Sequence, residues 1–236
     1  MNSHVLSSAS LIVRRLATCF ATGRQRLLGA LVLAGVCTAG YASIGIFNVS
    51  RLGWVNVPAV QAFRVDRMIP FTPAWVWIYL LYYPFCFLPL FLREVRENPS
   101  VFSQTLVAFA LQFGACFGFF LLWPLRMHHP VLSSGINANI LRLLYGFDLG
   151  YNSFPSLHVT NCVFVSCLYL HLRGLRQALP VCGVAGLIAV STLLVKQHFF
   201  SDILVGALLG WGSFVCAFTL VPATSRLGPE SRSRRA

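Results

Sequence analysis

Long apolar segments recur along almost the whole chain, and this repetition limits the folds open to it. A membrane-spanning helix needs about 20 mostly apolar residues. Only 10% of the residues are charged, against about 25% in soluble domains. The sequence therefore predicts an all-α, polytopic membrane bundle with six transmembrane helices. The six apolar segments lie at roughly 27–49, 73–92, 101–123, 156–174, 178–195 and 202–221.

The apolar segments predict a single membrane domain with a basic segment at each end. We expect a cytoplasmic basic N-terminal segment at 1–26, a six-helix membrane domain at 27–221, and a disordered basic tail at 222–236. A signal peptide within residues 1–42 is an alternative, and its cleavage would leave the sidedness of the later loops unchanged.

The cationic residues indicate an orientation. Six spans place both termini on one side, where 12 of the 18 Lys and Arg residues would then lie. The positive-inside rule makes that side the cytoplasm, so the loops at 50–72, 124–155 and 196–201 face away from it. Because the net charge of +12 is spread over the ends of apolar segments rather than over one polar face, nucleic acid is not an expected partner.

Three polar clusters lie at the predicted non-cytoplasmic ends of these helices, at residues 123–130, 152–158 and 196–202. An ionisable group inside a span costs about 2.5–3.5 kcal/mol on insertion scales. Clustered groups of this kind therefore indicate a functional site.

Two of the clusters contain the elements of phosphate chemistry. In the second, Asn152 or Ser153 could cap a helix with Pro155 in its first turn, which would leave backbone N–H groups around Ser156 to bind an anion. In the third, His198 and Asp202 are four residues apart, so they share one helical face.

Phosphate-ester cleavage needs a nucleophile, an acid for the leaving group and a cradle for the phosphate oxygens. We expect His198, oriented by Asp202, to be the nucleophile and His158 to be the acid. The helix start, with Arg126, Lys196 or Arg142, would supply the cradle.

Two of these clusters resemble motifs of the type 2 phosphatidic acid phosphatase superfamily. Pro155-Ser156-Leu157-His158 resembles its Pro-Ser-Gly-His motif, and Ser191-Thr192-x5-His198-x3-Asp202 resembles Ser-Arg-x5-His-x3-Asp. The resemblance covers roughly residues 100–220. It implies that His198 forms a phosphohistidine, Asp202 orients it, His158 protonates the leaving oxygen and Ser156 contacts the phosphate. It also implies that no metal or cofactor is required.

The first motif of that superfamily, Lys-x6-Arg-Pro, is essentially absent, because Leu122 and His129 stand at its Lys and Arg positions. Arg126 is a candidate substitute, and His129 is a candidate headgroup contact. Leu157 and Thr192 stand where the second and third motifs have Gly and Arg. In these two positions the chain resembles the inositol phosphorylceramide synthase-like branch, which transfers a phospho-headgroup to a lipid alcohol.

We therefore expect an integral-membrane lipid phosphatase or phosphotransferase whose partners are a phospholipid substrate, a lipid alcohol acceptor and membrane lipids. Three alternatives stay open: a nucleophilic Ser156, a non-catalytic transporter or scaffold, and a metal site in which His128 and His129 join His158, His198 and Asp202. Gly206 and Gly210 form a G-x-x-x-G pattern, which predicts close helix packing.

Overall fold

The computed structural model describes residues 11–13, 15–53, 64–125, 127 and 129–219. Within these ranges every regular element is helical, and an isolated bridge joins Leu125 to Asn152. The all-α prediction is confirmed for this part of the chain. Arg126, His128 and the predicted tail at 222–236 lie outside the described residues.

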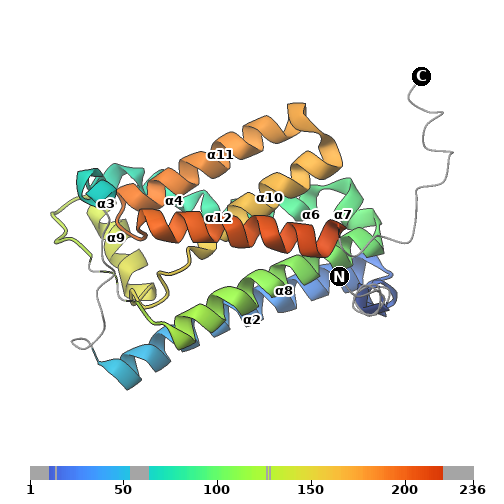
Figure 1. The fold of residues 1–236 in the computed structure, drawn as a ribbon, viewed down its shortest axis with the longest axis horizontal. Helices are drawn as coiled ribbons and strands as arrows, with labels where there is room; N and C mark the ends of the chain where they lie inside the picture. Colours follow the sequence, from blue (N-terminus) through green and yellow to red (C-terminus); the bar gives the residue numbers. More distant parts are fainter. Residues whose placement is uncertain (1–10, 14, 54–63, 126, 128, 220–236) are drawn as a thin grey trace.

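The long helices run roughly side by side and are joined by shorter ones (Figure 1). In chain order the elements are α2 (Gly23–Leu52), α3 (Arg64–Met68), η1 (Pro73–Trp75), α4 (Val76–Leu80), α5 (Tyr82–Cys86), α6 (Leu88–Phe91), α7 (Arg93–Glu97), α8 (Pro99–Leu122), α9 (Ile136–Phe147), α10 (Leu157–Arg173), α11 (Leu175–Leu194), α12 (Phe200–Phe214) and η2 (Val215–Thr219).

Four of the six predicted membrane segments form helices that are long and apolar enough to cross a membrane: Gly23–Leu52, Pro99–Leu122, Leu175–Leu194 and Phe200–Phe218. The helix of the fourth predicted segment, α10, has 17 residues. Four such helices fit an integral membrane protein. A count of six spans stays a prediction.

The segment predicted at 73–92 is divided into η1 and three short helices, with turns at Leu81 and Phe87. Proline has no N–H with which to bond the carbonyl four residues earlier. Pro84 and Pro89 therefore interrupt the backbone ladder three and two residues after these turns. Instead of one bent helix, the segment therefore has two interruptions, which separate α4, α5 and α6.

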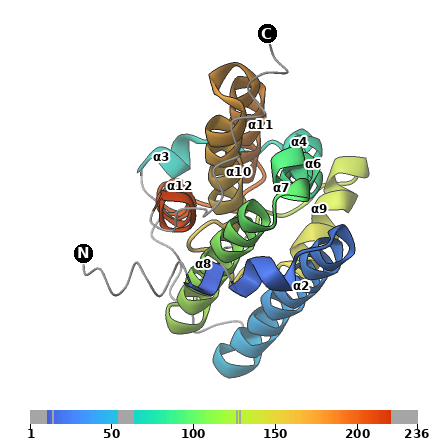
Figure 2. The same ribbon diagram turned by 90° about the vertical axis from the view of Figure 1, so that its right-hand side faces the viewer.

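Helix α10 is the centre of the bundle. It packs most extensively against α11 and α12, and it also contacts α8 and the short helices α5 and α6. Figure 2, which looks along the long helices, shows α10 among these neighbours. Because α10 is enclosed by protein, it can keep polar side chains such as Asn161 and Thr160 that would be costly in contact with lipid.

The G-x-x-x-G pattern serves close packing of α12 on α10, as predicted. A Cβ atom added to Gly206 would lie 2.6 Å from the carbonyl oxygen of Ser156, and one added to Gly210 would lie 2.3 Å from that of Thr160. The backbones approach this closely only because neither glycine carries a side chain. This contact holds the start of α12 against the start of α10.

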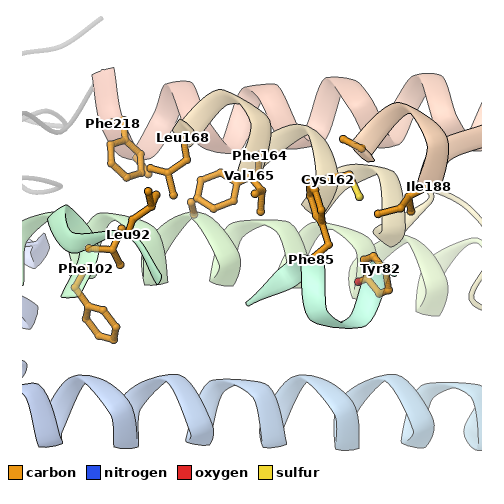
Figure 3. Packing of buried hydrophobic residues seen from close by; sticks show 14 residues of the cluster. Tyr82, Phe85, Leu92, Phe102, Cys162, Phe164, Val165, Leu168, Ile188 and Phe218 are labelled. Carbon is orange, nitrogen blue, oxygen red and sulfur yellow. The ribbon is translucent and has the colours of Figure 1, made fainter. Parts of the chain in front are cut away.

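The side chains of Tyr82 and Phe85 on α5 point toward α10, whereas Phe102 lies on the side of α8 that faces α2 (Figure 3). Phe102 also contacts Phe20 edge-on, with ring centroids 5.2 Å apart. The core thus lies mainly between α10 and its neighbours. Helix α2 borders an elongated cavity that is described below.

Candidate active site

The two histidines that the motifs single out lie against each other. His158 is the second residue of α10, and His198 lies in the turn between α11 and α12. Nδ1 of His158 is 3.2 Å from Nε2 of His198. Their exposed fractions are 7% and 2%. The fold therefore brings together two imidazoles that are 40 residues apart, in a site shielded from solvent.

The hydrogen-bond partners define which ring nitrogens carry protons. Nδ1 of His198 lies 2.8 Å from the carbonyl oxygen of Ser153, which can only accept, so this nitrogen is the donor. With both rings neutral, Nε2 of His198 is then a lone pair and His158 donates to it through Nδ1. Tyr79, 2.7 Å away, in turn donates to Nε2 of His158. In this neutral state the lone pair on Nε2 of His198 thus accepts the proton on Nδ1 of His158.

Backbone contacts hold His198 in place. Its N–H donates to the carbonyl of Thr192 at 3.3 Å, as does that of Gln197 at 2.9 Å. The hydroxyl of Thr192 donates to Ala189 in its own helix. Thr192, which stands where the superfamily motif has arginine, therefore supports His198 through its backbone carbonyl.

Asp202 lies beside His198 as expected, but it is not the nearest partner of the ring. Its Oδ2 is 3.5 Å from Nδ1 of His198 and accepts a hydrogen bond from the N–H of Phe199 at 2.8 Å. The carbonyl of Ser153 is nearer to the same ring nitrogen. The carboxylate, which is fully buried, thus adds negative charge next to the imidazole and ties the start of α12 to the site.

The prediction that Asn152 or Ser153 caps α10 was wrong. The helix begins at Leu157 with Ser156 as its N-cap, and the hydroxyl of Ser156 accepts from Val159 at 3.4 Å. Ser153 is used differently, because its hydroxyl donates to Gly150 and its carbonyl holds His198. The N–H of Ser156 donates to the carbonyl of Asp202 at 3.1 Å, which joins the two motifs directly.

The residues predicted to contact phosphate each have different partners in the structure. The ammonium of Lys196 donates to the carbonyl of Ile69 at 2.6 Å and reaches that of Asp66 at 3.4 Å. Partial burial lowers the pKa of Lys196, and the Asp66 carboxylate opposes that shift. His129 stacks on Tyr145, with ring centroids 3.8 Å apart. Arg126 lies outside the described residues, and a phosphate-binding role for these residues stays a prediction.

Arg142, the other cation considered for the cradle, anchors the loop before α9. Its guanidinium donates to the side chain of Asn139 at 2.6 Å and to the carbonyl oxygens of Ser133 at 2.5 Å and Leu132 at 3.2 Å. Within the described residues, no group of three or more His, Cys, Asp or Glu side chains is arranged to hold a metal ion.

Sequence reasoning missed Tyr79, whose hydroxyl bonds His158 and whose exposed fraction is 2%. Tyr79 lies on α4, in a segment rich in aromatic residues, where tyrosine is usually a packing or interfacial residue. It is 79 residues from His158 and outside every motif. We assign it as a positioning residue that holds the His158 ring through the hydrogen bond to Nε2.

Replacing Tyr79 with phenylalanine is expected to lower kcat about 10- to 100-fold with KM changed less than about twofold. The variant loses the hydrogen bond to Nε2 that orients the His158 ring, and general acid–base catalysis contributes roughly 10²–10⁴-fold. Steady-state kinetics in lipid nanodiscs measure the split. Tyr169→Phe, on a tyrosine of α10 that lies outside the histidine pair and its adjoining cavity, is the control and should match the wild type. Equal kinetics for both variants would rule out this role.

The geometry defines a class of protein: a helical membrane protein with a buried, paired-histidine centre suited to nucleophilic attack and proton transfer. The family comparison agrees with this class. The family model of the PAP2 superfamily matches residues 120–226, which include Ser156, His158, His198 and Asp202. Helices α2 and α4 to α6 lie outside the match. Curated proteins and solved structures yield no match.

Proposed function

We propose that this protein is an integral-membrane lipid phosphatase or phosphotransferase that works through a phosphohistidine on His198. The observation that carries the proposal is the buried contact of 3.2 Å between Nδ1 of His158 and Nε2 of His198. The match to the PAP2 superfamily supports a phosphatase-type protein, and the four long apolar helices support a membrane-embedded one. Both favour a phospholipid as substrate.

The first half-reaction forms the phosphoenzyme. Nε2 of His198 attacks phosphorus and the bond from phosphorus to the lipid oxygen breaks. His158, which carries a proton on both ring nitrogens at this step, gives its Nδ1 proton to the departing alkoxide and becomes a neutral imidazole. Asp202 lies beside the His198 ring, 3.5 Å from Nδ1, where its negative charge stabilises the cation that develops. The two nitrogens are too close to hold a phosphoryl group between them, so substrate binding must separate or turn the rings.

The second half-reaction reverses these steps with a new oxygen. Nδ1 of His158, now unprotonated, takes the proton of the incoming O–H group while that oxygen attacks phosphorus. The bond from phosphorus to Nε2 of His198 breaks, and both rings return to their starting states. Water as the attacking group gives a phosphatase, whereas a lipid alcohol gives a transferase of the phospho-headgroup.

For the arrangement in the membrane, the proposal retains six spans with cytoplasmic termini. The active site then faces the non-cytoplasmic side, because His158 and His198 both lie at the ends of helices that the positive-inside rule places there. Accessibility of single cysteines introduced into a cysteine-free variant at 132 and at 174 would test this. Labelling of residue 132 from the cytoplasmic side would contradict the orientation.

A second candidate is a non-catalytic membrane transporter or scaffold that retains the motif. The loss of the first-motif cations, together with Thr192 in place of arginine, favours it. In this case lipid would bind without any release or transfer of a headgroup.

The deciding experiment incubates purified protein in lipid micelles with a panel of headgroup-labelled phospholipids, with and without added diacylglycerol and ceramide. Release of labelled free phosphate or phospho-headgroup is the phosphatase result, and label on an added alcohol is the transferase result. Either activity should be lost in a His198→Ala variant. Lipid binding without turnover of any substrate would support the non-catalytic candidate instead.

A further inference from the structure

An elongated cavity of about 430 Å³ lies between α2 and α8 on one side and α4 to α6, α9 and α10 on the other. This volume lies within the range of about 300–1,000 Å³ that ligand pockets occupy. Its wall on α2 extends from Ala30 to Ala42. At 1.5 Å per residue this corresponds to about 18 Å of helix. The cavity is therefore long enough for an extended apolar chain.

The two ends of the cavity differ in character. At one end the wall includes His158, Tyr79 and Asp148, whereas Leu90 and Phe102 belong to the apolar remainder. His198 is not among the described wall residues, so the cavity reaches the pair from the His158 side. A ligand with one polar end and a long apolar body matches this distribution.

The charge of the wall argues against an anionic ligand inside the cavity. None of the described wall residues is Lys or Arg, and the wall contains the carboxylate of Asp148. That carboxylate is held by the hydroxyl of Tyr41 at 2.9 Å and the N–H of Gly150 at 3.0 Å. A phosphate or fatty-acid carboxylate here would meet a like charge in apolar surroundings, which weakens its binding.

One buried acceptor in the wall has no hydrogen-bond partner among the described residues, namely Oδ1 of Asn161. Asn161 is 1% exposed, and its Nδ2 donates to the hydroxyl of Tyr82 at 2.8 Å. It follows His158 by three residues on α10, so the two side chains share one helical face. Buried polar atoms are normally paired, so this acceptor is open to a donor group of a ligand in the cavity.

We propose that this cavity binds an uncharged lipid alcohol. Its hydroxyl lies beside Tyr79 and His158 and donates to Oδ1 of Asn161. Its apolar chain extends between α2 and α8. Asp148 excludes anionic lipids of the same chain length. The inference rests on the proposed function, because the alcohol is then the group that accepts the phosphoryl from His198. In the accepting direction its O–H proton passes to Nδ1 of His158 as the O–P bond forms and the P–N bond breaks.

The test uses a photoreactive long-chain 1-alkanol with the full-length protein in nanodiscs, and the cross-linked residues are mapped by mass spectrometry. We expect labelling of α2 and α8 at the cavity wall. Unlabelled alkanol should compete at a concentration at least tenfold lower than the fatty acid or the methyl ether of the same length. Competition by all three at equal concentration would overturn the proposal.

Four variants locate the site. Ala34→Trp fills the cavity and should reduce labelling at least tenfold, whereas Val36→Trp, on a side chain of the same helix that is 63% exposed, should leave it unchanged. Asp148→Asn should reduce the difference between the competing concentrations of alkanol and fatty acid. Asn161→Leu should reduce the difference between those of alkanol and methyl ether. Labelling that Ala34→Trp does not reduce would refute the site.

Parallel measurements on His198→Ala separate the two proposals. Equal cavity labelling in the wild type and His198→Ala, with no turnover by the wild type, would leave the lipid site intact and remove the phosphohistidine function. Turnover by the wild type without cavity labelling would support the phosphohistidine function and refute the lipid site. The alcohol site and the reaction therefore fail independently.

Discussion

Replacing His198 with alanine is expected to lower phospholipid turnover by at least about a thousandfold. The variant lacks the Nε2 lone pair that faces the acidic proton of His158, so no phosphoenzyme can form. Residues that act as a unit lose most of the catalytic effect when one member is removed. Turnover in nanodiscs, measured with the substrate that the lipid panel identifies, gives the ratio directly.

A trapping experiment isolates the chemical step. Wild-type protein quenched during turnover of a phosphorus-labelled lipid should carry label in a form that is stable to base and labile to acid, as expected of a phosphohistidine. His198→Ala should carry none. His171→Ala is the matched control, because His171 lies on α10 as well but packs against Phe214 and Phe218. Retained turnover or retained label in His198→Ala would disprove the covalent mechanism.

Replacing Gly210 with alanine is expected to destabilise the bundle by at least about 1–3 kcal/mol, the usual effect of overpacking a core. The new Cβ would lie 2.3 Å from the carbonyl oxygen of Thr160, so α12 must move away from α10. That movement also separates the helix that carries Asp202 from the one that carries His158. Both the thermal unfolding midpoint in detergent and the catalytic activity should fall.

Gly212 provides a control on the same helix. A Cβ there would meet no described atom within 4 Å, and alanine favours a helix interior over glycine by about 0.5–1 kcal/mol. Gly212→Ala should therefore unfold at the same temperature as the wild type or slightly above it. Indistinguishable midpoints for the two variants would show that the close approach of α10 and α12 does not limit stability.

Local patterns predicted several features of this fold correctly. Of the six spans predicted from runs of apolar residues, four form helices long enough to cross a membrane, and the spacing of Gly206 and Gly210 predicted the close helix contact. The prolines at 84 and 89 predicted a disturbed helix. Such features depend on neighbouring residues of the same segment, so they can be read without knowing the fold.

Predictions that required a partner distant in the chain were less complete. The α10 cap was assigned to Asn152 or Ser153 on the basis of residue preference, yet Ser153 is used to bind His198 through its carbonyl. Backbone carbonyls carry no residue identity, so no sequence pattern marks this contact. A phosphate contact of Lys196 stays a prediction, and no sequence pattern indicated that its ammonium binds the carbonyl of Ile69, 127 residues earlier.

The sequence by itself determined the helical class, the apolar character of the long helices and the residue types of the proposed phosphate-transfer site, because motif spacing and helical periodicity are local properties. Only the tertiary structure decided that His158 faces His198, that Tyr79 and Ser153 define their protons, and that α2 encloses a cavity ending at His158. These contacts join segments 40 to more than 100 residues apart, and they form only when packing of α10 against its neighbours fixes the relative positions of the helices.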